Sequence, residues 1–233
     1  MSIVEARDLS KYYVGGDGAP IQVLDNVNLE VRRGEMVAIV GTSGAGKSTL
    51  LHLLGGLDRP TRGFVVLDGE PLNASLTDEA LARIRNQKVG FVFQFHHLLR
   101  EFSALENVMM PLRIAGWSER KSRSRAEELL ARVGLEGRMA HRPSELSGGE
   151  QQRTAVARAL AVDPKVVLAD EPSGNLDNMN AERLHEQFVT LVRQLEIAMI
   201  VVTHNRALAA RADRTLLLDG GRLRETDVRE VVA

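Results

Sequence analysis

The chain has 233 residues with a hydrophobic fraction of 44%, which is enough for one large domain with a buried core. Its 30 Lys and Arg residues balance 31 Asp and Glu residues, so no charge excess favours nucleic acid or anionic lipid as a direct partner. The absence of cysteine excludes a disulfide framework and fits a reducing cytoplasm. The first residues lack the apolar core of a secretory signal, and no apolar run approaches the roughly 18 residues that span a bilayer.

Short apolar runs bounded by glycine, proline or charged residues predict buried β-strands, and segments with helical periodicity separate them. The strands are expected at 36–40, 89–93, 166–170, 199–203 and 215–219. The helices are expected at 49–57, 77–86, 104–114, 118–133, 147–161 and 180–195. Strands that alternate with helices predict an α/β fold with a mainly parallel sheet.

The N-terminal part follows a different pattern. Three partly alternating segments, IVEARDLSKYY, VLDNVNLEV and GFVVLDGE, predict antiparallel strands joined by turns at GGDGAP and RRGE. Residues 96–155 contain helical patterns and no convincing strand, so we interpret them as an inserted helical subdomain. We therefore expect a single domain, 1–233, in which 1–95 and 156–233 form the core together with the antiparallel strands.

The segment GTSGAGKST, residues 41–49, follows one predicted strand and opens a predicted helix. It fits the phosphate-loop pattern G-x-x-x-x-G-K-[ST] in the strand-to-helix context that this pattern requires. Glycines let successive backbone N–H groups face an anion, and the helix N-terminus adds partial positive charge. Lys47 can then reach the β- and γ-phosphates, and the Ser48 hydroxyl can bind Mg²⁺. The candidate nucleotide-binding residues are Gly41, Thr42, Ser43, Gly44, Ala45, Gly46, Lys47, Ser48 and Thr49.

A pair of carboxylates ends the predicted strand in VVLADEP, residues 166–172. Asp170 at the strand end can hold Mg²⁺, which prefers oxygen ligands and keeps part of its water shell. Glu171 can polarise an attacking water as a general base. Two solvated acids at the start of a loop would look the same, and it is the phosphate loop upstream that favours the catalytic interpretation.

The segment LSGGEQQR, residues 146–153, predicts a helix start with Ser147 as cap and Glu150 at the third helical position. Gly148 and Gly149 are costly in a first turn, which suggests that something approaches the backbone closely. A helix N-terminus with bare amides binds phosphate well. One nucleotide needs only one phosphate loop, so this second helix start would serve the same nucleotide from outside or another one.

With LSGGEQQR added to the phosphate loop and the acidic pair, the chain resembles the ABC-type ATPases over nearly its whole length. By the family pattern Tyr13 resembles the aromatic residue that stacks on adenine, and Gln94 resembles the Q-loop glutamine beside the metal. Asp177 in SGNLD resembles the D-loop aspartate, and His204 in VVTHN resembles the switch histidine.

The resemblance implies a head-to-tail homodimer with two ATP molecules between each phosphate loop and the opposing LSGGEQQR segment. Ser147, Gly148, Gly149 and Glu150 would then lie at the γ-phosphate held by the other subunit. It also implies an ATPase in which Glu171 activates water while Lys47, His204 and Mg²⁺ stabilise the developing charge. Three departures from the family pattern, Ala45, Ser173 and Asn205, remove no catalytic group.

Other interpretations exist for single residues. Tyr13 can be a half-buried strand aromatic, with Tyr12 as its neighbour, and His204 can be a structural cap after a buried strand. The basic run ERKSRSR, residues 119–125, fits the solvated face of a helix better than a nucleic-acid site. A soluble ABC ATPase that acts on DNA or ribosomes is the alternative from another class, but the chain has one cassette, no heptad run and no basic surplus.

The segment QFHHLLREF, residues 94–102, raises the question of whether His96 and His97 form a metal site, a core or an interface. Adjacent residues diverge in both strands and helices, so one ion cannot easily bind both imidazoles. A buried role remains open. The family resemblance implies that a membrane subunit docks on the helical subdomain near residues 94–110, and the apolar pattern there is typical of an interface. The residues expected on this surface are Leu98, Leu99, Phe102, Leu105, Met109 and Met110.

Three segments narrow the resemblance within the family: LLHLLGGLDRPTRG, RNQKVGFVFQFHHLL and HRPSELSGGE. They are similar to the ATPase subunits of bacterial lipoprotein-releasing transporters. That resemblance implies two copies of the chain bound to two permease subunits at the cytoplasmic face of the inner membrane, with membrane contact only through these partners. Macrolide- or peptide-export ATPases and the cell-division ATPase of the same branch share the general pattern and remain the near alternatives.

Overall fold

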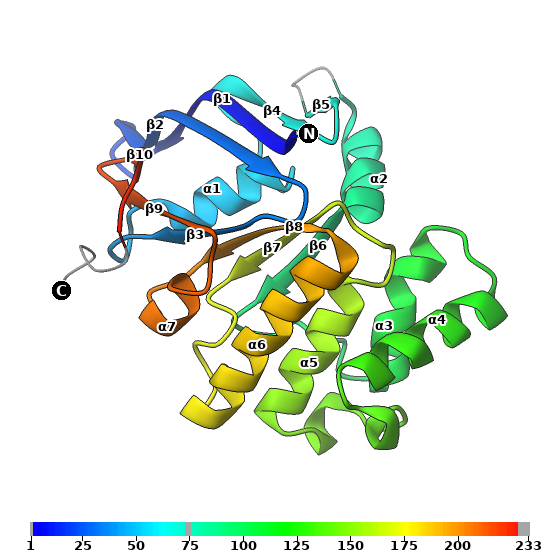
Figure 1. Ribbon diagram of the computed structural model, residues 1–233. Helices are drawn as coiled ribbons and strands as arrows, with labels where there is room; N and C mark the ends of the chain where they lie inside the picture. Colours follow the sequence, from blue (N-terminus) through cyan, green and yellow to red (C-terminus); the bar gives the residue numbers. More distant parts are fainter. Residues whose placement is uncertain (1, 73–75, 228–233) are drawn as a thin grey trace.

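The computed structural model describes residues 2–72 and 76–227, and within them one helix lies between two β-sheets while most other helices lie on the far side of the larger sheet (Figure 1). The predicted domain of residues 1–233 therefore includes residues 1, 73–75 and 228–233, which lie outside the described residues. The larger sheet has six strands in the order β10-β9-β3-β8-β7-β6. The smaller sheet has four, in the order β2-β1-β4-β5.

The larger sheet is parallel except for its edge strand β10, which pairs antiparallel with β9. The predicted strands lie within one residue of those observed, and the α/β class is confirmed. The sequence pattern missed β10, whose short segment RLRE carries almost no apolar signal. The six strands are β3 Met36–Val40, β6 Val89–Phe93, β7 Val166–Asp170, β8 Ala198–Val202, β9 Arg214–Asp219 and β10 Arg222–Glu225.

The smaller sheet is antiparallel, as predicted. Its strands are β1 Ser2–Val14, β2 Pro20–Arg32, β4 Arg62–Leu67 and β5 Glu70–Leu72. The segment predicted as one strand, GFVVLDGE, forms most of a hairpin instead, because Asp68 and Gly69 both have positive φ, at 49° and 79°. Two successive residues with positive φ are what a tight hairpin turn requires.

Among the described residues every α-helix except α1 begins where a small polar side chain caps its first amides. Ser103, Ser118 and Ser147 each accept a hydrogen bond from the backbone N–H three residues on, which sets the starts of α3, α4 and α5. A helix of only four residues, α7, was not predicted because it is too short for a periodic signal. The helices are α1 Lys47–Leu54, α2 Asp78–Lys88, α3 Ala104–Ile114, α4 Glu119–Arg132, α5 Gly148–Ala159, α6 Asn178–Leu195 and α7 Arg206–Ala209.

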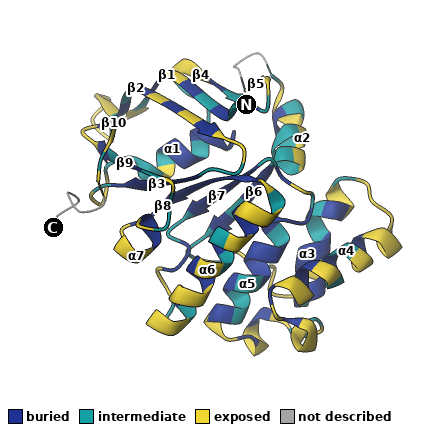
Figure 2. Ribbon diagram, in the orientation of Figure 1, coloured by how far each residue is buried: buried dark blue, intermediate teal, exposed yellow. Residues whose placement is uncertain are grey.

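Both faces of the larger sheet are buried, which explains why its strands read as continuous apolar runs (Figure 2). In β3 the side chains of Met36, Ala38 and Val40 join the core beneath α5 and α6, whereas Val37 and Ile39 join the core that contains α1. The second core also includes the inner face of the smaller sheet, so α1 lies between the two sheets (Figure 1). Side chains of one strand thus alternate between two cores.

The segment 96–155 contains α3, α4 and the first part of α5, and α3 packs against both of the others. α5 continues past residue 155 and approaches β6 so closely that a Cβ on Gly90 would lie 2.3 Å from the carbonyl oxygen of Ala159. One helix is therefore shared between the helical segment and the sheet. The boundaries of the subdomain at residues 96 and 155 stay a prediction.

Candidate active site

Four of the predicted motifs lie at one edge of the larger sheet because each directly follows a parallel strand. The phosphate loop follows β3, His204 lies two residues beyond β8, Glu171 follows β7 and Gln94 follows β6. The order β3-β8-β7-β6 makes these strands neighbours, so their carboxyl ends lie side by side. In open α/β sheets this edge is where ligands bind.

The phosphate loop depends on glycines at positions where a side chain would not fit. Gly41 has φ 154°, and a Cβ there would lie 2.3 Å from the carbonyl oxygen of Leu218. Gly46 has φ 96° and is the N-cap of α1, and no side chain caps this helix. The first amides of α1 therefore keep their donor capacity for an anion.

Lys47 is held over the same loop. Its ammonium donates hydrogen bonds to the carbonyl oxygens of Gly41, at 2.8 Å, and Thr42, at 2.9 Å. The side chain thus folds back along residues 41–46 and places its positive charge beside the backbone amides that face outward. Ser48, at the second position of α1, is exposed. The fit to a polyphosphate rests on this arrangement of amides, ammonium and hydroxyl at one helix start.

Glu171 and His204 are in direct contact. The Glu171 carboxylate lies 2.8 Å from Nδ1 of His204 and accepts hydrogen bonds from the His204 backbone N–H, at 3.1 Å, and from the Thr203 hydroxyl, at 3.1 Å. The imidazole is 74% exposed whereas the carboxylate is 17% exposed. The structure therefore brings the two predicted catalytic residues together, with the carboxylate anchored to the end of β8.

The backbone at Glu171 has an unusual conformation, with φ 44°. A non-glycine residue in the left-handed region costs about 1 kcal/mol or more, and it persists only where the surroundings hold it. Here the Glu171 N–H donates to the Val202 carbonyl oxygen at 2.9 Å. In this conformation the Glu171 carboxylate reaches Thr203 and His204 beyond the end of β8.

Gln94 lies over the loop that follows Glu171. A Cβ on Gly174 would lie 2.8 Å from the Gln94 amide nitrogen, so the glycine makes room for this side chain. Gln94 Nε2 donates to Asn175 Oδ1 at 3.0 Å, and Asn175 Nδ2 donates to the Gln94 carbonyl oxygen at 3.0 Å. Asn175 is a contact that the sequence analysis missed, although it lies in the quoted motif SGNLD. Asp177 ends the loop as the cap of α6.

The predicted capping box at the start of α5 is present. Glu150 accepts hydrogen bonds from the Ser147 N–H and hydroxyl, both at 2.8 Å, and the Ser147 oxygen accepts from the Glu150 N–H at 3.3 Å. The Arg138 guanidinium, together with these Ser147 bonds, lowers the pKa of Glu150 to about 2. The Ser147 hydroxyl therefore donates its hydrogen to Glu150 of the same chain.

The two glycines that follow differ in their surroundings. A Cβ on Gly148 would meet only Leu176 Cδ2, at 4.0 Å, so its outer side is open. A Cβ on Gly149 would lie 3.0 Å from the Asn180 side-chain oxygen, so packing against α6 already accounts for this glycine. The expectation of a close external approach thus rests on Gly148. Within the described residues no hydrogen bond joins 147–150 to 41–49.

Tyr13 lies near the end of β1 in the smaller sheet and is 41% exposed. Its hydroxyl donates to Asp58 at 2.8 Å, and the Lys11 ammonium lies 4.8 Å from the ring centroid. Partial burial, and then Asp58, raise the pKa of Tyr13. The ring is thus fixed at its hydroxyl end while much of its surface stays accessible. Its predicted stacking on adenine stays a prediction.

The segment QFHHLLREF is anchored by an arginine from α5. The Arg158 guanidinium donates to the carbonyl oxygens of His96, at 2.8 Å, and His97, at 2.6 Å. His97 has φ 48°, so the two peptide groups turn toward one donor. Burial lowers the pKa of the His96 imidazole.

Docking near residues 94–110 stays a prediction, and only some of the residues expected on that surface are exposed. Leu99 and Phe102 are exposed, at 43% and 37%, and so is the neighbouring Phe95, at 69%, whereas Leu98 and Met110 are half-buried. Leu105 and Met109 are not on the surface, because the inner face of α3 places both in the core at 8% exposure.

A groove of about 410 Å³ lies beside this segment, between α2, β6, α3 and α5. Its rim carries Leu57 and Ile114, at 44% and 68% exposure, neither of which the sequence pattern selected. Ile114 is the last residue of α3 and Leu57 lies three residues after α1, and at such positions periodicity does not separate a core residue from a surface one.

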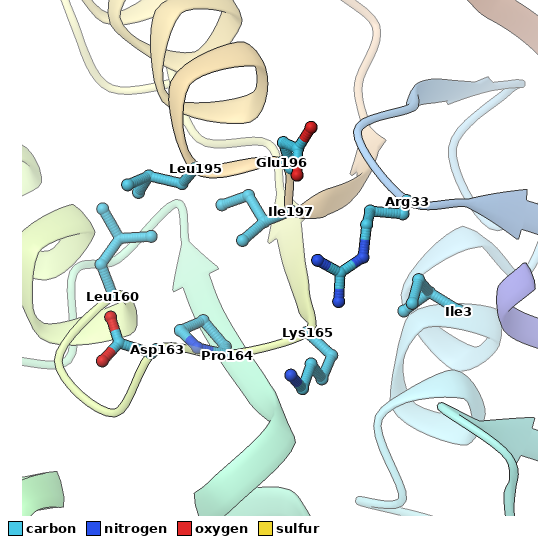
Figure 3. A pocket seen from close by; sticks show the side chains of 9 residues that line it. All are labelled: Ile3, Arg33, Leu160, Asp163, Pro164, Lys165, Leu195, Glu196 and Ile197. Carbon is cyan, nitrogen blue, oxygen red and sulfur yellow. The ribbon is translucent and has the colours of Figure 1, made fainter. Parts of the chain in front are cut away.

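A separate cavity of about 180 Å³ lies at the opposite edge of the larger sheet, where β7 and β8 begin (Figure 3). Arg33 and Lys165 project into it, and Asp163 and Glu196 stand at its sides (Figure 3). The two acidic and two basic side chains balance in charge, and Asp163 is already paired with Arg125. Because it lies at the opposite edge of the sheet, this cavity is not part of the site at the carboxyl edge.

A phosphate loop on one parallel strand, with a carboxylate and an imidazole on the next two, is the site of a nucleoside triphosphatase. Comparison with known proteins agrees, because the family model described as ABC transporter matches residues 24–174. The chain belongs to the ABC transporter family, as an ATP-binding cassette that hydrolyses ATP. Within residues 2–72 and 76–227 no helix combines the length and the apolar character needed to cross a membrane.

Curated relatives cover almost the whole chain. The lipoprotein-releasing system ATP-binding protein LolD of Geobacter metallireducens is 52% identical over 222 residues, which are 95% of this chain and 98% of that protein. The protein of the same name from Shewanella sp. strain MR-4 is 53% identical over 221 residues, 95% of each chain.

Solved structures match the fold equally well. The dimeric ATP-binding cassette MJ0796 in a post-hydrolysis state with ADP and Pi is 40% identical, with a TM-score of 0.88 over 97% of this chain and 99% of that one. The cassette cbiO1 from Clostridium perfringens is 28% identical, with a TM-score of 0.85 over 99% of this chain and 90% of that one. The predicted ABC ATPase fold is confirmed.

Proposed function

We propose that this chain is the ATPase subunit that powers a lipoprotein-releasing transporter. The observation that carries the proposal is the identity of slightly more than half of the residues, over nearly the full length, to relatives named for lipoprotein release. The motif segments that carry the resemblance are spread along the chain, at residues 50–63, 85–99 and 141–150. Membership of the ABC transporter family alone would support ATP hydrolysis but not a role in lipoprotein release.

Glu171 acts as the general base in this proposal. Its carboxylate is mostly shielded and is held by Thr203 and the His204 backbone, which fixes its direction toward the edge of the sheet. A positioned base contributes about 10²- to 10⁴-fold to the rate. Lys47 and His204 then stabilise charge on the γ-phosphate as it transfers to water, and the backbone amides of residues 41–46 bind the remaining phosphate oxygens.

Ser48, Asp170 and Gln94 are the residues that would hold Mg²⁺. A hydroxyl, a carboxylate and an amide oxygen are the oxygen donors that this ion prefers. Ser48 lies in the helix after β3, Asp170 ends β7 and Gln94 follows β6, and all three strands belong to the larger sheet. The ion would neutralise charge on the β- and γ-phosphate oxygens. Gln94 would take part through its amide oxygen, because its nitrogen already donates to Asn175.

The chain works as a head-to-tail homodimer in this proposal, with the start of α5 facing the nucleotide of the other copy. Two features support it: Gly148 is open on its outer side, and within the described residues no hydrogen bond joins the first turn of α5 to its own phosphate loop. The similarity to a dimeric cassette points the same way. Ser147 would need to release its hydroxyl from Glu150 to donate to a phosphate.

The membrane permease subunits dock at the groove beside β6, which we assign instead of the full segment 94–110. Leu57, Phe95, Leu99 and Ile114 supply exposed apolar area around it, and Arg85 and Arg158 line it. Gln94 directly follows β6, whose residues line the groove, so this one strand would link the docking groove to the nucleotide site. The chain would thus lie at the cytoplasmic face of the inner membrane through its partners.

The test is affinity purification of Glu171→Gln from gently solubilised native membranes with ATP and Mg²⁺, followed by mass spectrometry. The substitution keeps the size of the side chain and removes the base, so a closed dimer with its partners should accumulate. Recovery of two lipoprotein-release membrane subunits supports the proposal. Recovery of an export permease or a division protein would replace the cargo and keep the ATPase, and recovery of ribosomes or nucleic acid alone would refute the transport role.

A further inference from the structure

A buried histidine on α6 contacts the loop that carries Glu171. His185 is fully buried, and its Nε2 lies 3.0 Å from the Ser173 hydroxyl oxygen, which is itself in a residue only 5% exposed. A buried polar group without a partner costs roughly 1 to 3 kcal/mol. Nε2 of His185 and the Ser173 hydroxyl therefore each have a hydrogen-bond partner. This hydrogen bond links residue 173 to the second turn of α6.

The contact continues beyond His185 toward the segment that follows β8. Nδ1 of His185 lies 3.8 Å from the Glu182 carboxylate and has no hydrogen-bond partner among the described residues. Glu182 in turn accepts a hydrogen bond from Arg211, which lies two residues after α7. Ser173, His185, Glu182 and Arg211 thus form a line from the Glu171 loop to the segment that begins at His204.

Ser173 belongs to the turn that sets the direction of Glu171. The Gly174 N–H donates to the Glu171 carbonyl oxygen at 3.0 Å, and the Leu176 N–H donates to the Ser173 carbonyl oxygen at 3.1 Å. Glu171 itself has the left-handed φ of 44°, which costs energy and relaxes where the surroundings allow it. His185 is one of the contacts that hold this turn, in addition to the hydrogen bonds between Gln94 and Asn175.

We propose that His185 is a positioning residue for ATP hydrolysis, which holds the turn of Glu171 through its hydrogen bond to Ser173. The proposal rests on the proposed role of Glu171 as general base. His185 is buried beneath the loop and does not face the edge where the phosphates bind, so it acts on the rate through Glu171. A base displaced by a fraction of an ångström loses rate while substrate binding stays nearly the same.

The test measures steady-state ATP hydrolysis by the purified full chain. His185→Phe fills the volume without a hydrogen bond, and His185→Gln places an amide nitrogen near the position of Nε2. We expect His185→Phe to lower kcat about tenfold, as a misplaced catalytic group does, with KM for ATP within about twofold. His185→Gln should recover at least half of the wild-type kcat. Phe188→Leu, a buried change one turn further along α6, is the control for lost stability and should keep the wild-type kcat.

A double-mutant cycle shows whether the hydrogen bond is responsible. Ser173→Ala should lower kcat as much as His185→Phe does, and the double variant should lose no more than either single variant. Equal kcat in the wild type, His185→Phe and Ser173→Ala would overturn the inference, and so would losses that multiply in the double variant. If Phe188→Leu also loses kcat as its melting temperature falls, lost stability alone would explain the effect of His185. His185 would then have a structural role only. If His185→Phe does not fold, Ser173→Ala and His185→Gln decide by the same criteria.

The outcome separates this inference from the proposed function. Lys47→Ala measures the background of ATP hydrolysis in the preparation. Hydrolysis that does not depend on Lys47 does not come from this site. Lys47-dependent activity that Glu171→Gln leaves unchanged would overturn the proposed mechanism. Activity that depends on Lys47 and Glu171 but is indifferent to His185 and Ser173 would overturn the inference alone.

Discussion

Replacing Arg158 by methionine tests what fixes the segment after Gln94. Arg158 is half-buried, and burial lowers the pKa of its guanidinium. It donates to the His96 and His97 carbonyl oxygens at 2.8 and 2.6 Å. Methionine keeps the length of the side chain and removes both hydrogen bonds together with the charge.

The expected loss follows from these two bonds. A hydrogen bond to a charged group contributes about 1.5 to 3 kcal/mol, so the pair would give about 3 to 6 kcal/mol. Removal of a buried charge returns part of its desolvation cost, which reduces the expected net loss to about 2 to 3 kcal/mol. For a chain of this size each kcal/mol lowers the melting temperature by about 2 to 4 °C, so we expect a fall of about 4 to 12 °C.

The assay is urea unfolding followed by circular dichroism, together with amide hydrogen exchange of residues 95–99. Arg158→Met should lower the midpoint at an unchanged slope, and exchange in this segment should accelerate more than elsewhere. Arg120→Met, an exposed arginine of α4, is the matched control and should stay within about 0.5 kcal/mol of the wild type. Equal midpoints for Arg158→Met and Arg120→Met, with unchanged exchange at 95–99, would refute the reasoning.

Three further predictions concern packing, charge and docking. Gly90→Ala should destabilise the chain by about 1 to 3 kcal/mol, because the new Cβ would meet the Ala159 oxygen at 2.3 Å, whereas Gly137→Ala meets nothing within 4 Å and should be neutral in the same urea titration. Glu150→Gln should lower the melting temperature at pH 7. The difference from the wild type should shrink as the pH falls from about 4.5 toward 2, because a carboxylate with a lowered pKa stabilises the fold only while it is ionised. A difference in melting temperature that calorimetry finds constant over this pH range would contradict the assignment. Ile114→Asp should abolish binding of the permease subunits and spare basal ATP hydrolysis, whereas Thr190→Asp on the outer face of α6 should spare both, and co-purification of the Ile114→Asp chain with its permease would exclude the groove.

The sequence by itself determined the α/β class, most element positions and the identity of the motif residues. These features have local causes: buried strands are apolar throughout, capped helices begin at serine, and a phosphate loop needs glycines at fixed spacing. The strand β10, the helix α7 and the hairpin of β4 and β5 escaped because short elements carry little periodic signal. Leu105 and Met109 were assigned to a surface for a different reason. The sequence pattern does not show whether an apolar helix residue faces the core or a partner.

Only the tertiary structure decided which residues meet. The contacts of Glu171 with His204, of Gln94 with Asn175 and of His185 with Ser173 join positions 33, 81 and 12 residues apart in the chain. Such pairs depend on strand order, which places β6, β7 and β8 side by side, and on the depth at which α6 packs beneath them. Buried polar groups must find partners wherever the packed backbone brings them, and no local pattern encodes that choice.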